Sequence, residues 1–318
     1  MTSNIMIIGC GQLGSRHAQS LAKFNPRGTL TLVDPSLESL DKCHRLVLEN
    51  GFMGKIQVGT RPRDFSEPFD LLVVSTSSVE RAASIEEFFS TCSAPYVLLE
   101  KLLASNLEEL EKIHRTVSEV QMSAWVNCPM PYYPHFRDMT SALATQNSSE
   151  ILNYSVKSKS VGLITTSVHN LDHFARLAKS NVESITLTDD SLLCASKREG
   201  YAEIAGTLIA ETENKDVLIM EFDPRDNTPF HTIEIQKGRS SWKFEQHKGE
   251  LTEVQDGART VSKFETPLQS ALTGDSFAKL QSGTGLFFFK QKTAYEIHRL
   301  LLHELDRFVG AGSEVQFT

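Results

Sequence analysis

The stretch Ile5-Met6-Ile7-Ile8-Gly9-Cys10-Gly11-Gln12-Leu13-Gly14-Ser15-Arg16-His17 decides the fold of this chain. It joins an apolar strand to a GxGxxG turn and to the start of a helix. Gly9 permits the tight turn, Gly11 lets the backbone approach a diphosphate, and Gly14 allows close packing of the helix on the strand. Amides at the start of such a helix attract phosphate charge. We therefore predict a dinucleotide-binding turn that contains Gly9, Gly11, Gln12, Leu13 and Gly14.

An acidic residue at the end of the next apolar run strengthens this prediction. The run Thr29 to Val33 ends in Asp34, 20 residues beyond Gly14, where a carboxylate receives the hydroxyls of an adenosine ribose. A carboxylate there repels the 2′-phosphate of NADP and accepts hydrogen bonds from a free diol. We therefore predict NAD as the cofactor, in preference to NADP. The alternative is a structural glycine turn in which Asp34 caps a helix.

Length and composition restrict the class of protein. The 318 residues suit two domains, and 40% hydrophobic with 23% charged residues is typical of a globular chain with a sizeable core. A formal net charge of −8 is unfavourable for binding nucleic acid or an anionic membrane, because both require a basic surface. The five cysteines show no CxxC pair or metal-ligand spacing, so we expect reduced thiols and no metal site. Without an apolar signal core or a long apolar run, a cytoplasmic location is expected.

The first part of the chain alternates strands with helices, which is typical of a parallel sheet. We expect a doubly wound Rossmann sheet, of class α/β, as the NAD(P)-binding domain over residues 1–123. Its expected strands are Ile5 to Ile8, Thr29 to Val33, Ile56 to Val58, Leu71 to Val74 and Tyr96 to Leu99, with helices from Ser15, from Ser36 and around Arg81 to Phe89.

The proline-marked segment Asn127 to Pro134 separates this sheet from a different pattern. The rest of the chain predicts an α+β domain over residues 124–318, with a large, open, mostly antiparallel sheet for substrate binding and oligomerisation. Its expected strands are Ile151 to Val156, Glu203 to Ala210, Val217 to Phe222, Thr232 to Ile235 and Ser241 to Phe244. Its expected helices are Val168 to Ala178 and a closing amphipathic helix with Ile297, Leu301, Leu305 and Phe308 on one face.

The segment Phe287 to Ile297 resembles the translation of a common sequencing-library adapter. The alternative is an apolar run that leads into a native helix. We assign no function to it.

Two polar residues follow a buried strand in the first domain. The strand Tyr96 to Leu99 delivers Glu100 and Lys101 to the carboxyl edge of the sheet, where ligands bind in open α/β folds. A lysine beside a positively charged nicotinamide is pushed toward its neutral form, which makes it a better proton carrier near neutral pH. The alternative is an exposed ion pair after a strand.

A second candidate cluster opens a helix in the second domain. The sequence from Gly162 to His173 predicts a turn that enters a helix, with His169 in its first turn and Asp172 three residues later on the same face. Imidazole titrates near neutral pH, so His169 is the candidate for exchanging a proton with a substrate hydroxyl, and Asp172 would orient it or cap the helix. A structural histidine is the alternative.

Aromatic residues near the crossover form a third candidate. Tyr132, Tyr133 and His135 could line a sugar pocket, with the two phenols as reserve proton donors, or they could pack the crossover.

Four ordered motifs resemble the Gfo/Idh/MocA family, named for glucose–fructose oxidoreductase and inositol dehydrogenase. They are GCGQLGSRH at the start, DLLVVSTSS ending at Ser78, VLLEKLLA around Lys101 and GLITTSVHNLD ending at Asp172. The resemblance implies an NAD(P)-dependent dehydrogenase or reductase acting on CH–OH groups. It implies hydride transfer between nicotinamide and a secondary alcohol or ketone of a sugar-like substrate, such as a nucleotide sugar or a cyclitol.

The resemblance also implies roles for particular residues. Lys101 and His169 would act at the reacting oxygen and bind substrate, together with Tyr132 and Asp172. The cofactor would contact Ser75, Thr76, Ser77, Glu100, Lys101 and Asn127.

Three positions depart from the family pattern. Leu102 replaces the usual proline, Arg81 replaces a usual histidine, and Thr165 replaces a frequent aspartate four residues before His169. Thr165 is a third candidate catalytic residue, since its hydroxyl can hydrogen-bond although it cannot hold charge. These departures leave open an alternative function, that of a catalytically silent dinucleotide-binding sensor or scaffold.

The open sheet also suggests self-association. Members of the family commonly associate through this face, and a broad apolar surface needs cover in water. We expect a homodimer or homotetramer whose partner in function is a small sugar-like molecule, without nucleic acid or membrane.

Overall fold

A computed structural model describes residues 2–120, 122–144, 150–159, 161–282, 290–310 and 312–317. The chain forms two compact units, each described separately below. Unit 1 contains residues Met1–Asn127 and Pro267–Tyr295, and unit 2 contains Cys128–Thr266 and Glu296–Thr318. We predicted that the chain passes from one domain to the other once, at residue 123. In the structure it passes to unit 2 after residue 127 and returns to unit 1 after residue 266.

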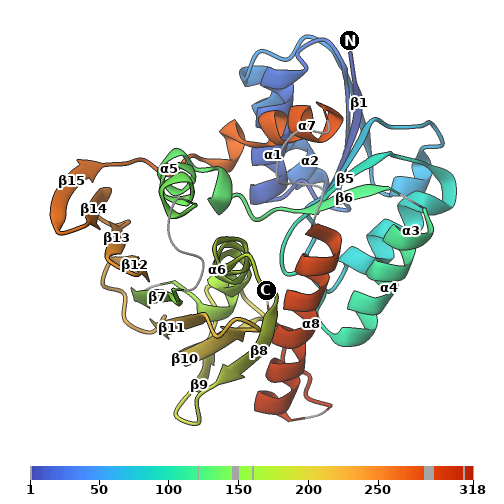
Figure 1. Cartoon of the computed structure of the whole chain (residues 1–318). Helices are drawn as coiled ribbons and strands as arrows, with labels where there is room; N and C mark the ends of the chain where they lie inside the picture. The colour runs from blue at the N-terminus through green and yellow to red at the C-terminus, as the bar shows by residue number, and fades with distance from the viewer. Residues whose placement is uncertain are drawn as a thin grey trace. The chain divides into compact units, whose positions relative to one another are not determined.

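Unit 1 is built on a six-stranded parallel sheet (Figure 1). The strand order is β3-β2-β1-β4-β5-β6, as in a doubly wound Rossmann sheet. The strands are β1 (Asn4–Ile8), β2 (Thr29–Val33), β3 (Lys55–Gly59), β4 (Leu71–Val74), β5 (Tyr96–Leu99) and β6 (Ser123–Val126), with helices α1 (Gln12–Phe24), α2 (Leu37–Glu49), α3 (Arg81–Thr91) and α4 (Leu107–Glu119) between them. The central strands are apolar and buried, which is why they read as continuous hydrophobic runs. This confirms the predicted α/β class.

A returning segment completes unit 1. It forms a short 3-10 helix, η3 (Gln269–Ala271), and α7 (Thr273–Ser282), and both contact α1. The rings of Phe24 and Phe277 meet edge to face with centroids 5.9 Å apart. The amide of Gly274 donates to the Ser20 hydroxyl at 3.0 Å. Helix α1 is therefore covered by a part of the chain about 250 residues away.

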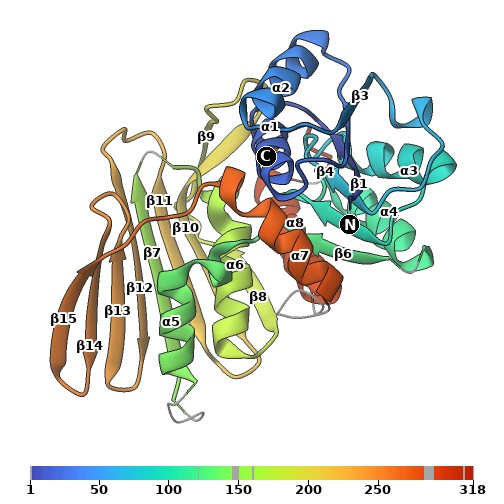
Figure 2. The same ribbon diagram turned by 90° about the horizontal axis from the view of Figure 1, so that it is seen from above.

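Unit 2 contains a nine-stranded sheet, which includes the five strands predicted from the sequence (Figure 2). The strand order is β15-β14-β13-β12-β7-β11-β10-β8, with β9 paired to β10. The β7–β11 pair is parallel and the other pairs are antiparallel, so the sheet is mostly antiparallel as predicted. The strands are β7 (Leu152–Lys159), β8 (Val182–Leu187), β9 (Leu192–Ala195), β10 (Ala202–Thr212), β11 (Val217–Asp223), β12 (Phe230–Lys237), β13 (Ser240–Glu245), β14 (Glu250–Gln255) and β15 (Ala258–Lys263).

Helices cover one face of this sheet. They are α5 (Pro134–Leu143) and α6 (Leu163–Ala178), which Figure 2 shows on the same side, and the short 3-10 helix η2 (Met130–Tyr132) contacts both of them. Residues of β7 alternate between buried and exposed, so every second side chain enters the core against α6. The core contains the buried rings of Phe136 and Phe244, whose centroids are 4.6 Å apart.

The prediction for the start of α6 was wrong by five residues. The helix begins at Leu163 instead of Val168, because Gly162 supplies the extended N-cap conformation and the carboxylate of Glu203 accepts the first free amides. His169 therefore lies in the second turn and Asp172 in the middle of the helix. Asp172 is not a helix cap.

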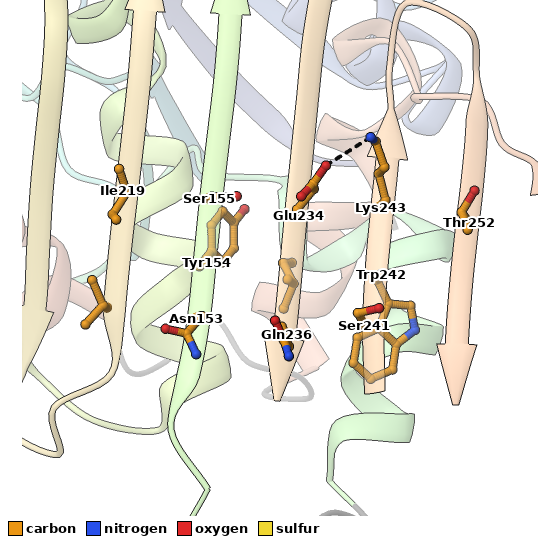
Figure 3. Close-up of a pocket in the computed structure, with 12 residues that line it drawn as sticks. Asn153, Tyr154, Ser155, Ile219, Glu234, Gln236, Ser241, Trp242, Lys243 and Thr252 are labelled. Carbon is orange, nitrogen blue, oxygen red and sulfur yellow. Dashed lines mark ion pairs between the residues drawn. The ribbon is translucent and has the colours of Figure 1, made fainter. Parts of the chain in front are cut away.

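The opposite face of the sheet carries a shallow pocket lined mainly by polar side chains (Figure 3). Lys243 and Glu234 form an ion pair across it at 3.0 Å, and Lys157 pairs with Glu221 at 3.0 Å on neighbouring strands. Ile219 is 36% exposed on the same face. The face around this pocket is more polar than the expected apolar surface, and homo-oligomerisation stays a prediction.

The closing helix is α8 (Lys290–Val309), on which Ile297, Leu301 and Leu305 are buried as predicted, whereas Phe308 is half-buried. Of the adapter-like segment, residues 287–289 lie outside the described residues, and the remainder forms the start of α8. None of the described helices is long and apolar enough to cross a membrane.

Candidate functional site

The glycine turn after β1 is closed by backbone contacts. Gly9 has φ +88°, and a Cβ atom there would lie 2.8 Å from the backbone of Ser75 and Thr76. A Cβ atom on Gly14 would lie 1.8 Å from the carbonyl oxygen of Gly9. A Cβ atom on Gly11 would meet no described atom within 4 Å. Gly9 and Gly14 therefore shape the turn, while Gly11 leaves space above it.

Helix α1 starts directly from this turn. Its N-cap is Gly11, and among the described residues no side chain caps it and no acidic residue lies in its first turn. Gln12 is exposed and Leu13 is half-buried. Within the described residues, the start of α1 thus has neither a side-chain cap nor an acid of its own, which suits a bound diphosphate.

Asp34 lies at the end of β2, beside the same turn. One carboxylate oxygen accepts a hydrogen bond from the Cys10 amide at 2.7 Å, and the other accepts one from the Ser36 amide at 2.8 Å. These bonds fix the side chain. Each carboxylate oxygen can accept a second donor, so the group remains able to bind ribose hydroxyls.

The loop after β4 is tied to the glycine turn. The Ser75 hydroxyl donates to the Gly9 carbonyl at 2.7 Å, and the Ser77 hydroxyl donates to the Glu80 carboxylate at 3.2 Å. The Thr76 hydroxyl oxygen is buried, and no hydrogen-bond partner for it is found within the described ranges. Ser75, Thr76 and Ser77 are the three predicted cofactor contacts in this loop. Among the described residues, the hydroxyls of Ser75 and Ser77 have hydrogen-bond partners and that of Thr76 has none.

Arg81 joins this loop to the segment after β5. Its guanidinium is buried and donates to the carbonyl oxygens of Thr76 and Leu102. The Lys101–Leu102 peptide bond is cis. Because β1, β4 and β5 are neighbouring parallel strands, the loops that follow them lie at one edge of the sheet.

Glu100 stands in a buried network at this edge. His17 Nε2 lies 2.9 Å from a Glu100 carboxylate oxygen, and the Asn127 amide donates to the same oxygen. On the other side, His17 Nδ1 lies 2.8 Å from the Thr273 hydroxyl. Gln269 completes the network by accepting from Asn127 and donating to Thr273, both at 2.9 Å.

This network keeps Glu100 ionised. Burial alone would raise the pKa of Glu100, but hydrogen bonds from His17 and Asn127 and the charge of Lys101 outweigh it, so the pKa lies below its ordinary value. A carboxylate that is charged at neutral pH therefore precedes Lys101, which is half-buried. The Asn127 Oδ1 atom is buried and has no partner within the described parts of the chain.

The second cluster lies in unit 2, on α6. Thr165 and His169 are four residues apart and share a face of the helix. The Thr165 hydroxyl donates to Glu203, a residue of β10 that is 3% exposed. His173 is fully buried beside the Tyr154 hydroxyl, at 3.1 Å, and is structural.

Asp172 is engaged by an internal partner. Its two carboxylate oxygens accept from Arg176 Nε at 2.6 Å and Nη2 at 3.1 Å, and the aspartate is buried. Burial raises the pKa of Tyr132, and the charge of Asp172 raises it further, while Arg176 opposes the shift. Burial also raises the pKa of Tyr133 to about 12. Both phenols are therefore weaker acids than a free tyrosine, and their part as reserve proton donors stays a prediction.

Several residues of these clusters escaped sequence reasoning. His17 was quoted only as part of the glycine motif, Glu203 only as the start of a strand, and Gln269, Thr273 and Arg176 were not singled out. No local pattern links Gln269 to Asn127 or Thr273 to His17, because each of these pairs is separated by more than 140 residues.

The residues of unit 1 fit a nicotinamide dinucleotide. The uncapped start of α1 and the space at Gly11 suit the diphosphate, and Asp34 suits the ribose. The buried oxygens of Thr76 and Asn127 suit donors of a bound group. Among the described residues, no group of three or more potential metal-ligating side chains is found.

Comparison with known proteins gives matches in structure alone. No family model and no curated protein matches the sequence. A UDP-N-acetylglucosamine 3-dehydrogenase from Acidithiobacillus ferrooxidans is similar with a TM-score of 0.71 at 12% identity, over 98% of this chain and 100% of that one. A putative NADPH-dependent oxidoreductase from Desulfitobacterium hafniense gives 0.77 at 11% identity, over 97% and 96% of the two chains.

A third similar structure is an oxidoreductase from Agrobacterium radiobacter in complex with NAD⁺, L-tartaric acid and magnesium. Its TM-score is 0.70 at 13% identity, over 95% of this chain and 94% of that one. These similarities extend over nearly the whole chain, through both the parallel and the mostly antiparallel sheet. The chain therefore has the fold of the Gfo/Idh/MocA-type oxidoreductases.

Proposed function

We propose that this protein is an NAD-dependent oxidoreductase that acts on a secondary alcohol or ketone of a sugar-like substrate. One observation carries the proposal. The glycine turn, the Ser75 to Ser77 loop and Lys101 follow three neighbouring parallel strands, so a dinucleotide site and a half-buried lysine share one edge of the sheet. The proposal is supported by the similar structures, which include a UDP-N-acetylglucosamine 3-dehydrogenase and an oxidoreductase in complex with NAD⁺.

Cofactor preference follows from Asp34. Its carboxylate is fixed by two amides beside the turn, where it favours a ribose diol over a 2′-phosphate. We therefore favour NAD over NADP, although the similar structures include both an oxidoreductase in complex with NAD⁺ and a putative NADPH-dependent oxidoreductase. When bound, the nicotinamide supplies or accepts the hydride.

The proposed catalytic residues of this chain act on the oxygen atom of the substrate alcohol or ketone. Lys101 donates a hydrogen bond to this oxygen, and Glu100 with its buried network holds the segment that carries Lys101. His169 exchanges the proton of the substrate hydroxyl, with Thr165 beside it. Asp172 holds the Arg176 guanidinium by two hydrogen bonds, and its part in binding substrate stays a prediction.

The test separates binding from turnover. Nucleotide sugars and cyclitols are added with NAD to the wild-type protein and to Lys101→Ala, and NADH formation is followed by absorbance. We expect the substitution to leave NAD affinity nearly unchanged and to lower turnover by about 10²-fold. An unchanged rate would remove Lys101 from the mechanism. NAD binding without turnover of any compound would favour the silent sensor.

A further inference from the structure

Arg81 is a buried cation at the start of α3. It is 2% exposed and is the first residue of the helix. Both features are unfavourable for a positive charge, because burial removes its hydration water and the amino end of a helix repels cations. A residue that breaks such local preferences often does so at a functional site, so the contacts of this arginine are of interest.

The Arg81 guanidinium connects two loops of unit 1. Its Nη1 atom donates to the Leu102 carbonyl oxygen, and its Nη2 atom donates to the Thr76 carbonyl oxygen. Thr76 follows β4, and Leu102 follows the neighbouring parallel strand β5. A guanidinium is planar and rigid, so two of its nitrogens fix the separation of the two oxygens that they bind. Arg81 therefore holds the two loops at a set spacing.

Lys101 lies between two anchored residues. Glu100, which precedes it, has a carboxylate oxygen 2.9 Å from His17 Nε2. Leu102, which follows it, is held at its carbonyl oxygen by Arg81. The first anchor leads to helix α1, and the second leads to the loop after β4. The backbone on both sides of the lysine is thus tied to elements that surround the glycine turn.

The loop after β4 is in close contact with the glycine turn. The Ser75 hydroxyl donates to the Gly9 carbonyl at 2.7 Å, and a Cβ atom on Gly9 would lie 2.8 Å from the backbone of Ser75 and Thr76. A dinucleotide bound over this turn would therefore restrain the Thr76 backbone as well. Because Arg81 binds the Thr76 carbonyl and the Leu102 carbonyl together, this restraint extends to the residue after Lys101.

We propose that Arg81 couples the binding of a dinucleotide at the glycine turn to the placement of Lys101. The inference rests on the proposed function and adds to it a residue outside the catalytic and cofactor contacts. Arg81 is a positioning residue, because it acts on the lysine through the backbone of Leu102. Bound cofactor restrains the loop after β4, and Arg81 transmits the restraint to the segment that carries Lys101.

The experiment is hydrogen–deuterium exchange of the wild-type protein with and without NADH, read by mass spectrometry. No substrate is added, so turnover is not required. We expect NADH to slow the exchange of backbone amides about fivefold or more both at residues 75–77 and at residues 102–104. Slower exchange at residues 75–77 with no change at residues 102–104 would overturn the proposal.

A substitution shows whether the second effect passes through the arginine. Arg81→Lys keeps the charge but replaces the planar fork by one nitrogen on a flexible chain, which cannot hold two carbonyls at a set spacing. At saturating NADH we expect this variant to keep the protection of residues 75–77 and to lose that of residues 102–104. Protection of both segments in Arg81→Lys would overturn the proposal, because the cofactor would then act on the second segment without the fork.

The matched control is an arginine that contacts the same helix on the surface. Arg63 is 55% exposed and pairs with Glu87 of α3 at 3.2 Å. Arg63→Lys should respond to NADH like the wild type at both segments. Thermal melting verifies that each variant is folded, and Arg81→Met, which removes both donors, replaces the lysine variant if that one does not fold. If neither folds, the wild-type exchange pattern still decides.

The readout separates a positioning role from a structural one. A purely structural Arg81 would lower the melting temperature on substitution but would leave the responses of the two segments to NADH linked. Failure of the inference is also distinguishable from failure of the proposed function. Protection of residues 75–77 alone would overturn the inference and leave the oxidoreductase in place, whereas no protection of either segment by NADH would contradict both.

Discussion

Helices α1 and α6 both begin at a glycine N-cap, and among the described residues neither has a side-chain cap of its own or an acid in its first turn. They differ in what faces that start. At α6 the carboxylate of Glu203 accepts the first amides, whereas at α1 a Cβ atom added to Gly11 would meet no described atom beyond its chain neighbours within 4 Å. The free amides of a helix start attract an anion in both cases. The comparison teaches that the fold itself supplies an anion to α6, and the contrast supports the proposal that α1 binds an anion from a cofactor.

The largest effect is expected from the glycines of the first turn. In Gly14→Ala the new methyl group would lie 1.8 Å from the Gly9 carbonyl, a backbone atom that cannot move aside. We expect a loss of more than about 4 kcal/mol in the free energy of unfolding, measured by denaturant titration. The matched control is Gly11→Ala, which should unfold like the wild type but bind NADH at least tenfold more weakly. Normal NADH binding by Gly11→Ala would break the contrast between the two helix starts.

A smaller effect is expected at α6. Gly162→Ala places a methyl group 1.9 Å from the Glu203 carboxylate, which can swing away at a cost of about 2 kcal/mol in folding free energy. In the double variant with Glu203→Ala the clash disappears, so the two single effects should not add. Strictly additive effects in this double-mutant cycle would show that Glu203 does not occupy the helix start.

The network behind Lys101 gives the next prediction. Thr273→Val keeps the shape of the side chain but removes the hydroxyl beside His17 and Gln269. We expect a loss of about 1 to 2 kcal/mol in folding free energy, because a buried imidazole nitrogen loses its partner. Thr273→Ser serves as the control and should unfold like the wild type. If valine is tolerated without loss, the returning segment does not hold Glu100 through His17.

The smallest effect is expected for the pH dependence of the free energy of unfolding, through the buried His173 of α6. Burial, helped by the charge of Arg176, lowers the pKa of His173 from 6.5 to about 3. The unfolded chain therefore takes up the proton first as the pH falls, so stability is complete above about pH 6.5 and declines toward pH 3. Between pH 7 and pH 6 the decline from this group is about 0.7 kcal/mol. His173→Gln should remove that part of the slope in denaturant titrations at the two values, and an unchanged slope would contradict a buried neutral histidine.

The glycine turn could be predicted from sequence because its signal is local. Gly9, Gly14 and Asp34 lie within a span whose spacing is set by one strand, one helix and the next strand. The order of the main strands in each unit could be predicted for the same reason. The start of α6 was misplaced because its cap comes from Glu203, about 40 residues later, and not from a neighbouring side chain.

Contacts over long sequence distances account for the remaining gaps. Thr273 meets His17 across 256 residues, and the parallel pairing of β7 with β11 joins strands that are not consecutive. Neither leaves a periodic pattern in the chain. In the sequence, a polar residue such as Thr273 cannot be told from a surface residue, because its partner is close only in the folded chain.

The central claim is that the start of α1, with Asp34 beside it, binds a nicotinamide dinucleotide. The most direct test is isothermal titration calorimetry of the wild-type protein with NADH and with NADPH. The account predicts a single site for NADH and binding of NADPH that is at least about tenfold weaker, because the 2′-phosphate meets a carboxylate. Absence of heat with both nucleotides, confirmed at a second temperature, would contradict it.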